Sequence, residues 1–257
     1  MSYSLKLLYS GSGGNAALLT AGDTAVLIDA GRSARTLSAA IERAGASPDR
    51  ISAIFLTHEH RDHTAALEVF LKHHPTPVHA AGATAEYLAG NPAIAPHLVL
   101  HPPIFCECVG DLTFSSFCTS HDSAQSVGYR IAVRESDHTA AVGYATDLGV
   151  ITPAVEEALL GCEAVVLESN HDEKMLMTGP YPYYLKKRIA SRRGHLSNRE
   201  CAVFSARLAA NGMKRLLLAH LSETNNDEEL ALGECRAALA GMAVSIRAAS
   251  PTDIVEL

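Results

Sequence analysis

The amino-acid sequence predicts an α/β fold in which two sheets pack face to face between helices, a four-layer αββα sandwich. Short apolar runs that are typical of strands alternate with segments whose apolar residues recur at helical spacing. The alternation occurs in each half of the chain, and consecutive short strands lie between the halves, so each half is expected to supply one sheet and its covering helices. Because no fixed-period repeat and no linker rich in Pro, Gly or Ser interrupts the pattern, residues 1–257 are expected to form one domain.

The first half of the chain is expected to contain strands followed by strand–helix alternation. Gly22 and Asp23 separate two apolar runs and give a hairpin signal, and Gly45 follows a helical pattern at a position where helices commonly end. A β-branched, apolar run then precedes a second helix. The expected strands are Ser4–Tyr9, Ala16–Thr20, Thr24–Asp29 and Ile51–Thr57, and the expected helices are Arg35–Ala44 and Thr64–His73.

The second half begins with short strands and then returns to alternation. Apolar runs at its end are again separated by helical patterns. The expected strands are Leu98–His101, Leu112–Phe117, Gly128–Val133, Ala140–Ala145, Ala164–Glu168, Leu216–His220 and Ala243–Ala248, and the expected helices are Thr152–Leu160, Arg199–Ala210 and Asp227–Ala240.

Composition excludes several classes of protein. A hydrophobic fraction of 47% excludes a disordered chain, and the longest apolar stretches fall far short of the roughly 20 residues that a membrane span needs. The first residues lack the charged start, long apolar run and cleavage site of a signal peptide. Six cysteines in a chain of 257 residues do not form a disulfide framework, so we expect reduced thiols, a cytoplasmic location and no membrane partner.

The charge of the chain is acidic overall and basic in one place. Lys and Arg number 21 against 28 Asp and Glu, and the net charge of −7 argues against a surface coated in cations for wrapping nucleic acid. One stretch nevertheless carries Lys186, Lys187, Arg188, Arg192 and Arg193. A solvated helix end is the simpler interpretation, but the histidine segment that follows this stretch favours contacts to phosphate.

The sharpest feature is His58-Glu59-His60-Arg61-Asp62-His63, which lies between an expected strand and an expected helix. In extended backbone, residues two apart point to the same side, so His58 and His60 can hold one ion. Asp62 and His63 lie at the turn into the helix and can hold a second. Imidazole and carboxylate suit zinc, manganese or iron. The single-zinc pattern His-Glu-x-x-His does not fit, because Asp62 occupies its second histidine position.

Further histidines and acids recur at the ends of apolar strands, where open α/β sheets place their ligands. Taken singly, each would be an ordinary polar residue at a strand end, but their recurrence favours a shared site. These residues are His121, Asp147, Glu168, His171 and His220, with His195 in Gly194-His195-Leu196-Ser197-Asn198 before a helix.

In their order, these motifs resemble those of the metallo-β-lactamase fold, an αββα sandwich of hydrolases, across essentially the whole chain. They are most similar to the WalJ/YycJ branch of small phosphodiesterases associated with exonuclease action on DNA, which is related to ribonuclease Z and PhnP. The further segments that carry this resemblance are Gly11-Ser12-Gly13-Gly14-Asn15, Thr146-Asp147-Leu148-Gly149, Glu168-Ser169-Asn170-His171-Asp172, Gly179-Pro180-Tyr181-Pro182 and Leu218-Ala219-His220-Leu221-Ser222, with Asp29 ending an earlier strand.

The resemblance implies a role for each matched residue. Two divalent ions (zinc, manganese or iron) are implied, the first held by His58, His60 and His121, the second by Asp62, His63 and His220, with Asp147 bridging both. Glu168 and His195 occupy the positions of a proton-delivery pair. Substrate contacts are expected from Asn15, Lys187, Arg188, Ser197 and Asn198.

The implied function is a dinuclear metal-dependent phosphodiesterase, a nuclease that resembles DNA exonucleases. Two cations about 3.5–4 Å apart can share a hydroxide as nucleophile and stabilise the leaving oxygen. Asp62 could aim that hydroxide, and His195, oriented by Glu168, could protonate the leaving alkoxide. A small-molecule hydrolase of the same fold (a thiolesterase, lactonase or cyclic-phosphate diesterase) is the alternative. A non-catalytic metal-binding or scaffold protein is a third, although degenerate metal motifs would mark it and none of the seven positions is lost.

Overall fold

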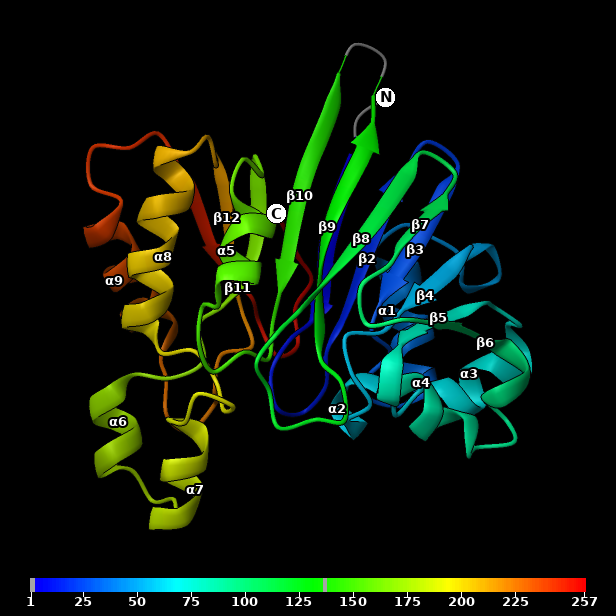
Figure 1. The fold of residues 1–257 in the computed structure, drawn as a ribbon, viewed down its shortest axis with the longest axis horizontal. Helices are drawn as coiled ribbons and strands as arrows, with labels where there is room; N and C mark the ends of the chain where they lie inside the picture. Colours follow the sequence, from blue (N-terminus) through cyan, green and yellow to red (C-terminus); the bar gives the residue numbers. More distant parts are fainter. Residues whose placement is uncertain (1–2, 136–137) are drawn as a thin grey trace.

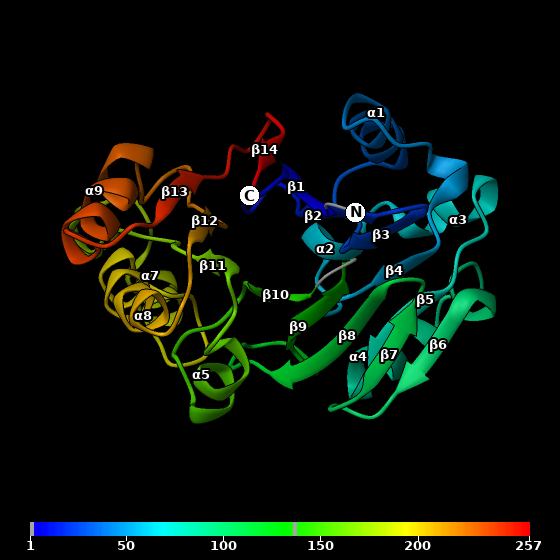
Figure 2. The ribbon, with the colours of Figure 1, turned by 90° about the horizontal axis from the view of Figure 1, so that it is seen from above.

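The computed structural model describes residues 3–135 and 138–257, which form two facing sheets with helices on both outer sides (Figures 1 and 2). Within the described residues each sheet has seven strands. The first sheet has the order β14-β1-β2-β3-β4-β5-β6 and the second the order β13-β12-β11-β10-β9-β8-β7. The predicted αββα sandwich is therefore confirmed.

The first sheet comes from the first half of the chain and from its last residues. β1, β2 and β3 pair antiparallel, whereas β3 to β6 pair parallel and need helical crossovers. Its strands are β1 (Tyr3–Tyr9), β2 (Ala16–Ala21), β3 (Thr24–Ile28), β4 (Ala53–Phe55), β5 (Val78–Ala81), β6 (Leu98–His101) and β14 (Val255–Glu256), and its helices are α1 (Ala34–Arg43), α2 (Arg61–Thr64), α3 (Leu67–His73) and α4 (Gly82–Ala89), with 3-10 turns at Pro48–Arg50 and Ala95–His97.

The second sheet is antiparallel from β7 to β10 and parallel from β10 to β13. Its strands are β7 (Cys106–Val109), β8 (Leu112–Cys118), β9 (Val127–Arg134), β10 (Thr139–Ala145), β11 (Ala164–Glu168), β12 (Arg215–Ala219) and β13 (Ser245–Ala248), and its helices are α5 (Pro153–Leu159), α6 (Glu173–Thr178), α7 (Tyr183–Ile189), α8 (Asn198–Ala210) and α9 (Glu228–Ala238).

Three apolar layers hold the sandwich together. Between the sheets, Phe55 stacks on Phe114 with ring centroids 3.9 Å apart, and Tyr129 meets both rings edge-on. A second layer packs the helices of the first half on their sheet, where α1 buries Leu37 and Ile41 at the predicted helical spacing. A third layer lies between the second sheet and its helices, among them α8 and α9. No helix in the described part of the chain combines the length and apolarity needed to cross a membrane.

The structure also differs from the sequence-based elements in places. The helix predicted over Thr64–His73 is divided into α2 and α3, and the strand predicted over Ile51–Thr57 is shorter. Elements that sequence reasoning missed are β5, α4, β7, α6, α7 and β14. α6 and α7 lie at the same edge of the sandwich as α2, at the bottom of Figure 1. The helices α6 and α7 therefore lie beside the edge that carries the histidine motif.

Candidate active site

The candidate site lies at the carboxyl ends of the central strands, where the two sheets meet the loops. His58 and His60 lie between β4 and α2, and Asp62 and His63 lie in α2 itself. The other predicted ligands follow strands of the second sheet. These are His121 after β8, Asp147 after β10 and His220 after β12. The structure thus brings all seven predicted metal ligands to one edge.

The ligands form two groups that Asp147 joins. Ligand atoms of His58, His60 and His121 lie within 4.8 Å of one another, and so do those of the second group, Asp62, His63 and His220. The carboxylate of Asp147 lies between the groups: its Oδ2 is 3.3 Å from His63 Nε2, and its Oδ1 is 3.5 Å from His220 Nε2 and 3.9 Å from His121 Nε2.

The residues present fit divalent metal ions. His58 Nε2, His220 Nε2 and Asp147 Oδ2 are buried and have no hydrogen-bond partner within the described chain. A buried polar atom without a partner costs free energy, and these three are all of the type that coordinates zinc, manganese or iron. His58 and His220 belong to the two groups just described, one to each, and Asp147 joins these groups. The unsatisfied atoms therefore mark where metal ions would bind.

Partners outside the two groups fix the orientation of the histidine rings. His63 Nδ1 donates to Asp29 Oδ2 at 2.8 Å, and Asp29 in turn accepts from the backbone N–H and the hydroxyl of Thr57. His121 Nδ1 donates to the Gly194 carbonyl at 3.0 Å. Because each Nδ1 is engaged, each Nε2 is left for a metal, which is the usual role of such partners. Asp29 was noticed in the sequence only as a strand end.

Three residues of this region have left-handed backbone. Asp29, Asp147 and His220 have φ values of 63°, 56° and 56°, and each follows the last residue or residues of a strand. For residues with a Cβ this conformation costs about 1–2 kcal/mol and concentrates at functional sites. Here it turns the chain sharply out of the sheet and directs side chains toward the common edge.

Buried carboxylates and imidazoles of the site lie next to one another, and each shifts the pKa of its neighbour toward the charged form. Burial would raise the pKa of Glu168, but the imidazoles of His195 and His220 outweigh it and hold this pKa well below its ordinary value. Burial would likewise lower the pKa of His220, but the nearby carboxylates, Asp147 first, raise it to about 10. The same balance, with Asp29 the main cause, raises the pKa of His63 well above its ordinary value. Because metals bind the neutral imidazole, binding of a divalent ion here would be coupled to loss of a proton from these histidines.

Glu168 connects the ligand His220 to His195. Its Oε1 accepts from His195 Nδ1 at 2.8 Å and from His220 Nδ1 at 2.9 Å, and its Oε2 accepts from the N–H groups of Leu148 and Leu196. The carboxylate is fully buried, whereas the His195 side chain is 21% exposed. Since Glu168 occupies His195 Nδ1, the nitrogen of His195 left for a substrate is Nε2.

The predicted substrate contacts have different surroundings. Asn15 is buried, and its Nδ2 is 3.2 Å from Asp62 Oδ2 and 3.0 Å from His63 Nε2, so it touches the metal ligands directly. Ser197 caps α8 through a capping box with Glu200. The buried Asn198 side chain bonds to Ser169 and Asn226. Ser197 and Asn198 are therefore held by protein groups.

Two residues of the basic stretch contact the segment that carries His121: Arg193 donates to the His121 carbonyl, and Arg188 reaches the next residue. Arg188 pairs with Asp122, next to His121, and lines a cavity of about 180 Å³ together with His195. Lys187 is exposed and its ammonium lies 4.8 Å from the centre of the Tyr183 ring. Further residues that line this cavity lie in the segments that carry the family resemblance, although the sequence assigned none of them a role; they include Ser12, Asn170, Tyr181 and Ser222.

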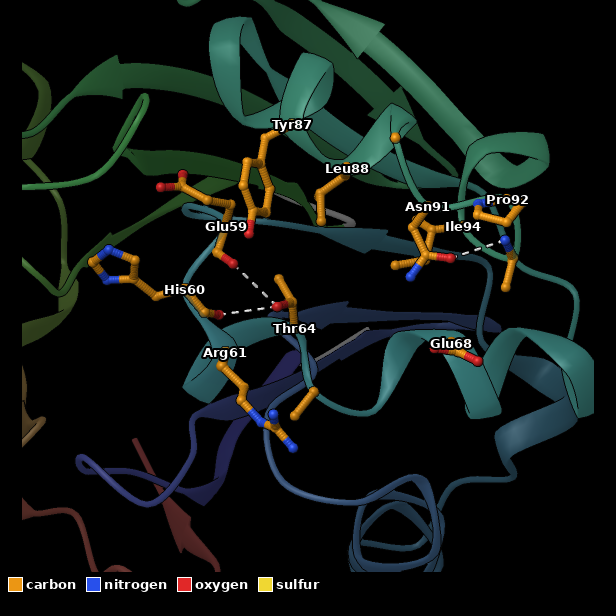
Figure 3. Close-up of a pocket in the computed structure, with 13 residues that line it drawn as sticks. Glu59, His60, Arg61, Thr64, Glu68, Tyr87, Leu88, Asn91, Pro92 and Ile94 are labelled. Atoms are coloured by element: carbon orange, nitrogen blue, oxygen red, sulfur yellow. Dashed lines mark hydrogen bonds between the residues drawn. The ribbon is translucent and has the colours of Figure 1, made fainter.

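A larger hollow, of about 1050 Å³, lies on the other side of the histidine motif. His60, Arg61 and Glu59 line it together with the exposed Tyr87 of α4 (Figure 3). His60 belongs to the first ligand group, so this hollow borders the candidate metal centre, although the His60 ring points away from the hollow in Figure 3.

A prediction follows from the close packing beside Asp62. Gly31 donates to the Asn15 carbonyl and Asn15 donates to the Asp62 carbonyl, and a Cβ on Gly31 would lie 2.0 Å from that Asp62 oxygen. Gly31→Ala is expected to lower the free energy of unfolding by about 1–3 kcal/mol and to reduce metal content, measured by thermal denaturation and elemental analysis. Gly233→Ala in α9, where no atom lies within 4 Å, is the control and should not destabilise the protein. Equal behaviour of both variants would contradict the argument.

Fold and site together define a class: a hydrolase with an αββα sandwich whose metal ligands lie at the carboxyl edge of its sheets. The chain belongs to the β-lactamase superfamily, since the model of the β-lactamase superfamily domain matches residues 24–221. Membership in this fold implies divalent metal binding. The family resemblance stated from the sequence is confirmed.

The chain is also similar to individual proteins of known name or structure. The chain is 33% identical over 234 residues to exodeoxyribonuclease YycJ of Bacillus anthracis, covering 90% of this chain and 87% of the relative. It is 29% identical over 233 residues to exodeoxyribonuclease WalJ of Streptococcus pneumoniae, covering 89% and 85%. Among solved structures, the metallo-β-lactamase fold protein YhfI of Bacillus subtilis superimposes with a TM-score of 0.73 at 18% identity, over 99% of this chain and 100% of that one.

Proposed function

We propose that the protein is a dinuclear metal-dependent phosphodiesterase that acts on nucleic acid as a DNA exonuclease. The Glu168–His195 pair carries the proposal. His195 has a ligand atom within 4.8 Å of those of Asp147, Glu168 and His220, but its Nδ1 is 2.8 Å from the buried Glu168 carboxylate, and it is not needed to complete the two groups joined by Asp147. Cleavage of a natural phosphodiester expels an alkoxide of high pKa, which needs a proton, whereas a thiolester expels a thiolate, which does not. The names of the relatives YycJ and WalJ support DNA as the substrate.

The role that we propose for each residue of the site follows from its position. Divalent ions held by the two groups would supply an activated water and charge stabilisation at phosphate. Asn15 and His63 hold Asp62, whose carboxylate is 27% exposed and so can accept a hydrogen bond from the attacking water. Asp29 keeps His63 in the tautomer with a bare Nε2. The chain thus orients both the ligands and the nucleophile.

His195 would deliver the proton to the leaving oxygen. With Nδ1 donating to Glu168, Nε2 is the ring nitrogen that would carry this proton to the leaving oxygen. His195 lines the same cavity as Arg188, whose guanidinium can approach a phosphate oxygen. His195, the proposed general acid, and the cationic Arg188 therefore line one small cavity beside the ligand groups.

The cationic stretch before His195 gives a prediction about polynucleotide binding. Lys187 and Arg192 are exposed, and neither forms an ion pair with a carboxylate among the described residues, whereas Arg188 pairs with Asp122. The double variant Lys187→Gln/Arg192→Gln should bind DNA more weakly and with a flatter salt dependence, the log–log slope falling by about 1–2. Hydrolysis of bis-p-nitrophenyl phosphate should hardly change.

The control for this variant is Lys72→Gln/Arg236→Gln, which removes two exposed cations from α3 and α9. Binding is measured by fluorescence titration of labelled single- and double-stranded DNA at several salt concentrations. An unchanged salt slope in the Lys187→Gln/Arg192→Gln variant, or equal loss of activity on DNA and on the small diester, would refute the proposed phosphate contacts.

A small-molecule hydrolase is the second candidate, and the size of the cavity at His195 favours it. At about 180 Å³, with Leu185 and Ile189 of α7 in its wall, this cavity suits a compact diester better than a duplex. Rates on cyclic nucleotides, a thiolester and a lactone, compared with the rate on oligonucleotides, separate the two candidates. The nuclease proposal requires oligonucleotides to be the best of these substrates by kcat/KM.

A further inference from the structure

A second cluster of possible metal ligands lies where the edges of the two sheets meet. His79 belongs to β5 and His101 ends β6, the edge strand of the first sheet. Glu107 belongs to β7, the edge strand of the second sheet, and both strands appear at the lower right of Figure 2. None of these three residues belongs to the two ligand groups of the active site.

The two imidazoles are held in a defined arrangement. His79 Nδ1 lies 2.9 Å from His101 Nε2, so one proton is shared between them. His79 stacks on Phe55 at 4.4 Å and His101 stacks on Phe105 at 4.0 Å, and the two histidine rings are themselves nearly parallel. Packing against aromatic rings removes most of the freedom that a ligand side chain must otherwise lose when it binds a metal.

Glu107 completes the set. One ligand atom of each of His79, His101 and Glu107 lies within 4.8 Å of the other two. In the strand alternation of β7 the neighbouring cysteines point the other way: Cys106 and Cys108 are exposed and contact β8. The face of β7 that meets the histidines therefore presents a carboxylate and no thiol.

We propose that His79, His101 and Glu107 form a third metal site, which binds one divalent ion of the zinc type and joins the edges of the two sheets. Two imidazoles and one carboxylate are a known zinc ligand set that leaves one position for water. With zinc–nitrogen distances near 2.0–2.1 Å, a tetrahedral ion separates its nitrogen ligands by about 3.3 Å. The observed 2.9 Å therefore needs a small opening, in which the ion replaces the shared proton.

The protonation state of the pair agrees with this assignment. Burial, together with His101, lowers the pKa of His79 to about 4, and burial also lowers the pKa of His101. Glu107 is the carboxylate that faces both rings and opposes these shifts. The imidazoles are thus neutral near pH 7, the form that coordinates metals.

The test measures metal stoichiometry rather than activity. After equilibrium dialysis against zinc, Glu107→Gln and His101→Gln are each expected to hold one equivalent less than the wild-type protein at the same free zinc concentration. Glu107 is half-exposed, so its variant should fold even if His101→Gln does not. The control His97→Gln, in the turn before β6, should keep the wild-type stoichiometry.

The site can be separated from the catalytic centre in an Asp147→Ala background. That protein should retain one equivalent of cobalt with visible d–d absorption, and adding Glu107→Gln should abolish it. Loss of all cobalt in Asp147→Ala alone, or equal stoichiometry of Glu107→Gln and the wild type, would overturn the third site and leave the proposed function untouched.

Discussion

Asp147→Ala protein is expected to lose most of its metal and its hydrolytic activity while it keeps its fold. Asp147 lies between the two ligand groups, within 3.3–3.9 Å of Nε2 atoms of His63, His220 and His121. Removing a residue that only orients a ligand costs about 10–100-fold in metal affinity or activity, so removing this shared carboxylate should exceed 100-fold. Elemental analysis, circular dichroism and a diester assay measure the three quantities.

Two control variants separate coordination from backbone effects. Asp147 has φ 56°, and alanine in this region costs about 1–2 kcal/mol, whereas asparagine tolerates it. Asp147→Asn should therefore remain as stable as the wild type and still lose metal. Asp111→Ala removes a carboxylate that pairs with Arg134 on the surface and should change neither property. Two full equivalents of metal in active Asp147→Ala protein would contradict the seven-ligand assignment.

His195→Ala is expected to slow cleavage of a natural phosphodiester by about 100-fold or more while metal content stays unchanged. The imidazole would protonate an alkoxide, so its loss matters in proportion to how poor the leaving group is. A p-nitrophenyl diester, whose leaving group departs as a stable anion, should be affected much less. The ratio of the two rates, measured with metal content in the same sample, is the readout.

The structure explains why His195→Ala tests proton delivery more specifically than Glu168→Gln does. Glu168 Oε1 accepts from His220 Nδ1 as well as from His195 Nδ1, so altering it disturbs a metal ligand together with the proton donor. Glu168→Gln should therefore show the same leaving-group selectivity only after correction for lost metal. If His195→Ala lowers both rates equally and in step with metal or stability, His195 is a structural residue and the proton-delivery role is wrong.

Local patterns in the sequence were sufficient for the long elements. The helices predicted over Arg35–Ala44 and Arg199–Ala210 lie where they were expected, and the groups that cap them, Ser33 and the Ser197–Glu200 pair, are themselves local in the sequence. α7 was missed because it buries no residue fully and follows Pro182 without a side-chain cap, so it has no amphipathic stripe to detect. α4 begins at Gly82 with φ 49° and lacks a side-chain cap as well.

The site was predictable where its residues are close in sequence. His58 to His63 form one motif, and the resemblance to known motifs supplied the remaining ligands. The connections among them were not predictable, because they join residues far apart: Asp29 reaches His63 across 34 positions, and Glu168 reaches His220 across 52. The same holds for Asn198, whose buried partner Asn226 lies 28 positions away.

The most direct test of the proposed function is the size of the products formed from end-labelled DNA. Metal-reconstituted protein is incubated with 5′- and 3′-labelled single- and double-stranded DNA, with RNA as comparison and His195→Ala as the inactive reference. The account predicts that mononucleotides accumulate from one labelled end of DNA from the earliest times, with little or no such product from the variant. Release of no nucleotides from any polynucleotide, alongside rapid hydrolysis of a small diester or thiolester, would contradict it.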